Sequence, residues 1–205
     1  MKQLIVTFLT LLASIAGYGQ KNFKLLEEGV YPLFYSIPIH SDKFEVRKML
    51  HLDQGATDVA YQEWCKCISA NLSNHSSLEY LGRNSRFVAW FDTTEYRTNG
   101  RKVISSYDEI DLSRCVKQVE QIRALLEPLC YKIETSVVSE VDGAKNRKGE
   151  GYFFYSSKEN HDKDRPFLTV SYMYMDLTEY NKREFVGKKE KSFYELEVFL
   201  RENDL

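Results

Sequence analysis

The clearest hydrophobic pattern in the chain spans residues 111–129 and is typical of an amphipathic helix. At about 100° per residue its apolar side chains share one stripe, made up of Leu112, Cys115, Val119, Ile122 and Leu126. Asp111 can cap the amino-terminal end, and Pro128 lacks the amide hydrogen that a continuing helix needs. The pattern predicts a helix that buries one face and against which the other elements pack.

A β-hairpin is predicted before this helix. Residues 86–97 and 101–107 are rich in β-branched and aromatic side chains. Asn99 and Gly100 stand between them, a pair that tolerates the positive φ angles of a type I′ turn. We therefore expect two antiparallel strands that turn at these residues.

A three-stranded antiparallel meander is predicted after the helix, over residues 130–140, 151–157 and 167–175. In the first of these strands apolar residues such as Ile133 and Val137 alternate with polar ones. This alternation predicts a half-buried strand with both residues facing the core.

Two capping boxes predict further helices. Asp42 with Glu45 opens a helix within residues 41–52, and Ser192 with Glu195 opens a last helix at the carboxy-terminal end. In each box the first side chain can accept hydrogen bonds from free backbone amides of the first helical turn.

Three segments have weaker patterns. Residues 57–71 fit an amphipathic helix centred on Trp64 and Ile68. Residues 29–40 contain two prolines, which favours an extended segment or an edge strand. Residues 176–191 are dense in charge, which favours a solvated loop or a short extra strand.

This order of elements predicts an α+β fold. We expect one mostly antiparallel sheet of about five strands, made of the hairpin and the meander, with the helices packed on it. Residues 20–205 suit a single domain of this kind.

The first 19 residues predict a secretory signal peptide. Lys2 precedes an apolar run over residues 4–16, and Gly17 and Gly19 are small residues placed for signal peptidase. Since no cysteine stands near the cleavage position, we expect neither an acyl chain nor another membrane anchor. The expected location is outside the cytoplasm, either periplasmic or extracellular.

The overall charge argues against nucleic-acid binding. The chain has 28 basic and 30 acidic residues, a formal net charge of −2, without a block of basic residues. A protein that binds the phosphate backbone needs a basic surface, so we expect no nucleic-acid partner.

An exported chain with four cysteines can form up to two disulfides. Cys115 and Cys130 lie near opposite ends of the predicted central helix, roughly 20 Å apart, which is too far for a bond between them. Cys65 and Cys67 point in different directions if they share a helix. A disulfide, if formed, then joins one pair to the other, and the alternative for Cys115 is burial as a small apolar residue.

Familiar catalytic and cofactor motifs are absent from the sequence. It contains no P-loop, no dinucleotide-type glycine pattern, no Gly-X-Ser-X-Gly and no His-Glu-X-X-His. His51, Cys65, Cys67 and His75 are of the types that bind zinc, but cysteines on opposite flanks of one helix cannot hold one ion. We therefore expect no cofactor, no metal and no catalytic residue.

His161 offers the best alternative to a non-catalytic protein, since it stands among acidic residues in a loop between two predicted strands. It would place a hydrolase site in that loop. Carboxylate pairs for glycoside hydrolysis cannot be chosen among Glu134, Glu140, Asp142 and Glu150, which also fit a solvated sheet edge.

The density of tyrosine favours binding. Tyr152, Tyr155, Tyr172 and Tyr174 lie on two neighbouring strands of the predicted meander and supply rings to both faces of the sheet. Either terminal helices cover the second face, or an exposed tyrosine surface binds a protein, peptide or glycan. The sequence thus predicts an exported binding or interaction module, with a periplasmic or secreted hydrolase and an inhibitor or immunity-type partner protein as alternatives.

Overall fold

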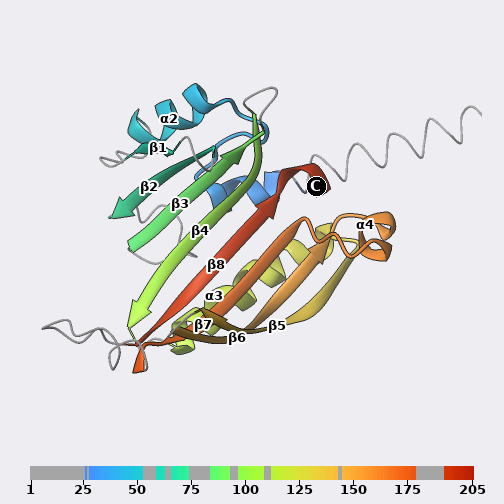
Figure 1. Ribbon diagram of the computed structural model, residues 1–205. Helices are drawn as coiled ribbons and strands as arrows, with labels where there is room; N and C mark the ends of the chain where they lie inside the picture. Colours follow the sequence, from blue (N-terminus) through green and yellow to red (C-terminus); the bar gives the residue numbers. More distant parts are fainter. Residues whose placement is uncertain are drawn as a thin grey trace, which may run out of the picture.

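The computed structural model describes Leu26 and residues 28–52, 59–62, 66–73, 84–92, 97–108, 112–142, 145–178 and 192–205. The predicted signal peptide and most of residues 176–191 lie outside this part of the chain. The described strands form one antiparallel sheet in the order β1-β2-β3-β4-β8-β7-β6-β5 (Figure 1). The α+β class with one antiparallel sheet is confirmed, but the sheet has eight strands and not about five.

The strands are β1 (Ala60–Gln62), β2 (Cys67–Ser73), β3 (Asn84–Phe91), β4 (Thr98–Asp108), β5 (Lys132–Asp142), β6 (Lys145–Tyr155), β7 (Leu168–Asp176) and β8 (Phe193–Arg201). The α-helices are α2 (Lys43–Leu52), α3 (Leu112–Leu126) and α4 (Lys158–Asp162). Short 3₁₀ helices are η1 (Tyr31–Phe34), η3 (Glu127–Leu129) and η4 (Glu202–Asp204).

The central helix is confirmed. Four of the five residues of the predicted stripe are buried, among them Val119 and Ile122, while Leu112 at the start is 38% exposed. Pro128 lies in η3, a single 3₁₀ turn that ends the helix. α3 packs against β7, β8 and β4, and in Figure 1 it lies behind these strands. We call this side of the sheet the helix face.

The helix predicted within residues 41–52 is also confirmed and is α2. The carboxylate of Asp42 accepts hydrogen bonds from the amides of Phe44 and Glu45, at 2.8 and 2.9 Å. Val46 and Leu50 are buried, whereas Phe44 is 74% exposed. The cap therefore fixes where the helix begins, and only part of its apolar surface reaches the core.

The predicted carboxy-terminal helix is wrong, because β8 occupies this region and is a central strand between β4 and β7. Leu196, Val198 and Leu200 are buried, and the residues between them are half-buried. This period of two is that of a strand. Backbone pairing on both sides outweighs the capping signal at Ser192.

The predicted helix over residues 57–71 is wrong as well, because β1 and β2 pair there as antiparallel strands, with Ala60 opposite Ser69. Lys66 between them has a φ of 48°, which a helix does not allow and a tight turn uses. β2 pairs in turn with β3, so both β1 and β2 are strands of the sheet.

The predicted hairpin of β3 and β4 is confirmed, but its turn is not at Asn99-Gly100. Phe91 pairs with Thr98, so the chain reverses between these two residues, and Asn99 and Gly100 belong to β4. Gly100 lies opposite Trp90 and Arg201. A side chain there would come within 3.3 Å of the Leu200 carbonyl oxygen, so close strand packing accounts for the glycine.

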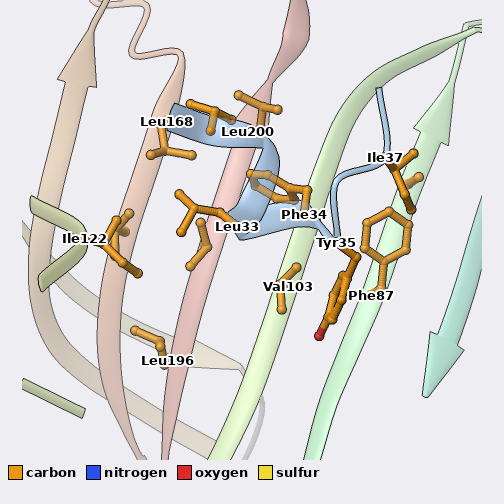
Figure 2. Close-up of a cluster of buried hydrophobic side chains, with 14 of the residues drawn as sticks. Leu33, Phe34, Tyr35, Ile37, Phe87, Val103, Ile122, Leu168, Leu196 and Leu200 are labelled. Atoms are coloured by element: carbon orange, nitrogen blue, oxygen red, sulfur yellow. The ribbon is translucent and has the colours of Figure 1, made fainter. Parts of the chain in front are cut away.

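Residues 29–40 are not extended as predicted, since they contain η1 and further turns. Proline is tolerated in the first turn of such a helix, which explains how Pro32 fits. Leu33, Phe34 and Ile37 are almost fully buried against β8, β4 and β3 (Figure 2). This segment and α3 form the cover of the helix face.

The carboxy-terminal end is fastened to this cover by a buried ion pair. The guanidinium of Arg101 contacts the carboxylate of Glu202, and both side chains are fully buried. Arg101 also donates to the backbone carbonyls of Ile37 and Pro38, while Glu202 accepts from the hydroxyl of Thr98 at 2.7 Å. Three distant segments therefore meet at one charged centre.

The meander of β5, β6 and β7 is confirmed. β6 approaches β7 very closely at Gly149 and Gly151, where an added Cβ would come within 2.1 Å or less of a β7 carbonyl oxygen. The burial expected for β5 is wrong in part: Val137 is 79% exposed and Tyr131 52% exposed. β5 is an edge strand of the sheet, and α3 does not cover these positions.

No helix among the described residues combines the length and the apolar character that crossing a membrane requires.

Candidate functional site

The most developed surface feature is a groove between α3 and the free edge of the sheet. Paired residues of antiparallel strands point to the same face, so the strand register defines its floor. One row across the strands contains Leu196, Tyr172, Glu150 and Val137, and the next contains Val198, Val170, Tyr152 and Thr135. In both rows the inner residues belong to the core and the outer ones lie in the groove.

The wall of the groove is the flank of α3, formed by Val116, Val119 and Glu120. The cavity between wall and floor measures about 330 Å³. It continues along α3 into a second, more polar hollow of about 490 Å³, and Thr135 and Tyr152 line both. We call the two together the α3–β5 groove.

One carboxylate of the groove, Glu120, has a partner on each of its two oxygens. Glu120 accepts a hydrogen bond from the Tyr152 hydroxyl at 2.5 Å and another from the Arg123 guanidinium at 3.2 Å. The guanidinium also lies 5.3 Å from the centre of the Tyr152 ring. The hydrogen bond to Glu120 raises the pKa of the Tyr152 phenol, and burial raises it further. These three side chains form a fixed polar bridge between helix and sheet.

The second carboxylate, Glu150, is exposed and lies on the floor beside Tyr172. The Tyr172 hydroxyl is 3.4 Å from one of its oxygens, a distance at the long limit of a hydrogen bond. The pKa of the Tyr172 phenol is raised mainly by burial and further by the nearby charge of Glu150. Glu150 thus keeps most of its capacity to accept hydrogen bonds.

The more polar part of the groove is bordered by Cys130 and by the β5 edge at Lys132 and Glu134, although the strand register places these two side chains on the opposite face. Lys132 and Glu134 form an ion pair of 2.6 Å. Burial raises the pKa of the Cys130 thiol to about 12. Because a thiol reacts as its thiolate, Cys130 is a poor nucleophile.

Tyr152 and Tyr172, two of the four predicted binding tyrosines, line the groove. Tyr174 belongs to the next row on the same face, with its ring 5.1 Å from that of Tyr194. Tyr155 points to the opposite face and is buried, 1% exposed. The structure therefore does not bring the four tyrosines together on one surface.

The expected cover of the opposite face by terminal helices is wrong. The amino-terminal segment packs on the same face as α3, and the carboxy-terminal segment is β8.

His161 lies in α4, next to the edge strand. Its Nε2 atom is 2.9 Å from a carboxylate oxygen of Glu134 and 2.9 Å from the Lys132 amine. Its ring packs edge-on against Tyr155, with centroids 4.9 Å apart, and the Tyr155 hydroxyl donates to Asp164. The cluster ties the β6–β7 connection to β5, and His161 lines neither part of the α3–β5 groove.

The candidate carboxylates do not form a glycosidase pair. Glu134 shares its row with Phe153 on the face opposite the helices, whereas Glu150 lies on the helix face. Two groups on opposite faces of one sheet cannot flank the same bond. The side chains of Glu140 and Asp142 lie outside the described residues.

Cys115 and Cys130 form no disulfide, so neither of them is bonded to the other pair. Cys115 is buried in the core, in line with the alternative prediction. Cys65 lies outside the described residues, and Cys67 belongs to β2 and not to a helix.

His75 also lies outside the described residues. In the part of the chain that the structure describes, no group of three or more histidine, cysteine, aspartate or glutamate residues could hold a metal ion.

Sequence reasoning missed the α3 wall and the exposure of Val137. The pattern of alternation assigned Val137 to the core because it could not show how far α3 extends across the sheet. One indication of this exposure was present in the sequence: the strand is the first of the predicted meander, where it can have a single neighbouring strand.

Comparison of the chain with protein-family models, with curated proteins and with solved structures found no match. The site must therefore be interpreted from its own geometry.

Proposed function

We propose that the protein is a non-catalytic interaction module that binds an extended peptide segment of a partner protein in the α3–β5 groove. One observation carries this proposal: α3 packs on β7, β8 and β4, and the helix face of β5 beyond them remains open. Val137, an apolar residue, is 79% exposed there. An exposed apolar position in a groove that two tyrosines also line favours contact with another molecule.

An extended segment suits this place because β5 is the edge strand of the sheet. An edge strand offers unpaired backbone amides and carbonyls, which a peptide can pair with as an added strand. Alternate side chains of such a peptide would point into the groove towards Tyr152 and Tyr172. Backbone pairing would supply affinity, and the groove would supply specificity.

The module is proposed to act after export, because the first 19 residues have the pattern of a signal peptide. An inhibitor or immunity-type role would be one form of the same binding function.

The test is selection of binding peptides from a random displayed library on the purified protein, followed by affinity measurements on two variants. V137R introduces a bulky charged side chain at the groove, whereas F44R makes the same kind of change at an exposed apolar residue of α2. We expect selected peptides to bind wild type and F44R alike and to lose at least about tenfold in affinity for V137R. Failure to select peptides, or equal binding to V137R, would overturn the proposal.

A hydrolase remains the second candidate, because His161 contacts the Glu134 carboxylate at 2.9 Å and so resembles an oriented general base. If the purified protein hydrolyses a peptide, ester or glycoside substrate and H161A abolishes that activity, the non-catalytic proposal is wrong.

A further inference from the structure

We infer that the α3–β5 groove selects a segment that presents a lysine or arginine side chain, which Glu150 and Tyr172 recognise. This inference rests on the proposed function and specifies the chemistry of the partner.

The charge of the groove is the first argument. Its apolar part is lined by two ionisable acidic residues, Glu120 and Glu150, and by none that is basic among the described residues. Arg123 and Tyr152 already occupy the two oxygens of Glu120. Among the described residues, the polar contact of Glu150 is the Tyr172 hydroxyl at 3.4 Å, which leaves the carboxylate open to a cation.

The position of Glu150 is the second argument. In the strand register it stands directly between Tyr172 and Val137, with the half-buried Val116 on the wall opposite. Lysine and arginine side chains bury their aliphatic stems against apolar surface and keep the charged end at a polar group. A tyrosine ring beside that end adds a cation–π contribution.

The size of the cavity is the third argument. A volume of about 330 Å³ is at the small end of the range for binding pockets. It suits one long side chain better than a run of bulky ones. An extended peptide paired to β5 would place every second side chain on the helix face, so one of these can be the basic residue.

The experiment uses three synthetic peptides that differ at one central position. They are acetyl-Thr-Val-Lys-Val-Thr-amide and its analogues with norleucine or glutamate in place of lysine. Each is titrated up to millimolar concentration into the ¹⁵N-labelled protein, and binding is followed by amide chemical shifts. Norleucine has the length of lysine without the charge, so the comparison isolates the contribution of the cation.

We expect the lysine peptide to bind at least about fivefold more tightly than the norleucine peptide, and the glutamate peptide to bind most weakly. E150Q should reduce the difference between lysine and norleucine to less than about twofold, and E150D should retain most of it. E159Q is the matched control, because Glu159 is an exposed glutamate on α4, outside the groove, that pairs with Lys163. It should leave all affinities unchanged.

Two results contradict the inference in different ways. If all three peptides shift the β5 and groove amides with equal affinity, the groove binds peptides without charge selection, and the inference fails while the proposed function stands. If none of them binds, or if shifts map elsewhere, both fail. Shifts of the groove amides by a neutral oligosaccharide but not by the peptides would point to a glycan and also overturn both.

Discussion

At the scale of single residues, the Arg101–Glu202 pair is an ion pair whose disruption should be costly for stability. Both side chains have no exposed area, and they hold η4, β4 and the amino-terminal segment together. Removing one member of a buried pair leaves the other charge without compensation in a medium of low polarity. The pair therefore matters more for stability than the exposed ion pairs of the sheet.

E202A should lower the free energy of unfolding by about 3–5 kcal/mol. E197A removes a partly exposed pair with Lys102, 2.9 Å long, and should cost no more than about 1 kcal/mol. Urea unfolding followed by circular dichroism measures both. Equal losses in the two variants would show that the buried pair has no special weight.

Two buried tyrosines predict how stability depends on alkaline pH. Burial raises the pKa of Tyr35 and of Tyr155 to about 12, with a smaller contribution from Asp164 at Tyr155. In the unfolded chain a tyrosine loses its proton near pH 10. Between these values the native state binds more protons than the unfolded state. The contribution of the two tyrosines to stability is therefore fully present below pH 10 and is lost as the pH rises towards 12.

Y155F removes one of these groups. It should reduce the slope of the free energy of unfolding against pH by the equivalent of up to about one bound proton. Urea unfolding of wild type and Y155F at several pH values between 9 and 11 gives the two slopes. Identical slopes would mean that Tyr155 ionises alike in both states, contrary to its burial.

At the scale of elements, α3 is the helix whose burial organises the helix face. Ile122 is fully buried, whereas Leu125 on the same helix is 39% exposed. I122A should lower the free energy of unfolding by about 2–5 kcal/mol, because it leaves a cavity against β7 and β8. L125A should cost less than about 1 kcal/mol in the same urea experiment. Similar costs for both would contradict the packing of α3 on the sheet.

The elements that were predicted correctly are those whose signals are local. α3 has a complete apolar stripe, α2 has a cap that the structure contains, and β5, β6 and β7 are joined in sequence. β8 could not be recognised in the same way, because its partners β4 and β7 are distant in the sequence. The glutamates at 195 and 197 alternate with Leu196 and Val198, which is a strand pattern. The capping box at Ser192 nevertheless favoured a helix in the prediction from sequence.

The region of residues 57–71 failed for a related reason. A helical stripe and a two-strand pattern are hard to distinguish in a short amphipathic segment. The turn at Lys66, with its positive φ, is made by a residue that gives no turn signal in the sequence.

At the scale of the whole molecule, the site exists because the helical cover is narrower than the sheet on which it packs. The helix face is covered by η1 and α3 over the middle of the sheet and by α2 near β2 (Figure 1). The edge at β5 extends beyond this cover and forms the floor of the groove. Two of the four tyrosines predicted as binding residues from their positions on neighbouring strands, Tyr152 and Tyr172, line it. Val137, Glu150 and the α3 wall depend on where α3 ends across the sheet, which no local pattern encodes.

Amide hydrogen exchange of β5 tests the central claim, that the open edge at the α3–β5 groove is the binding surface, most directly. Outward-facing amides of an edge strand lack a partner and exchange quickly. With acetyl-Thr-Val-Lys-Val-Thr-amide bound, the account predicts that exchange slows within Lys132–Asp142 and stays unchanged in β1 at the other edge of the sheet. Unchanged exchange in β5, or slowing confined to β1 or α4, would contradict it.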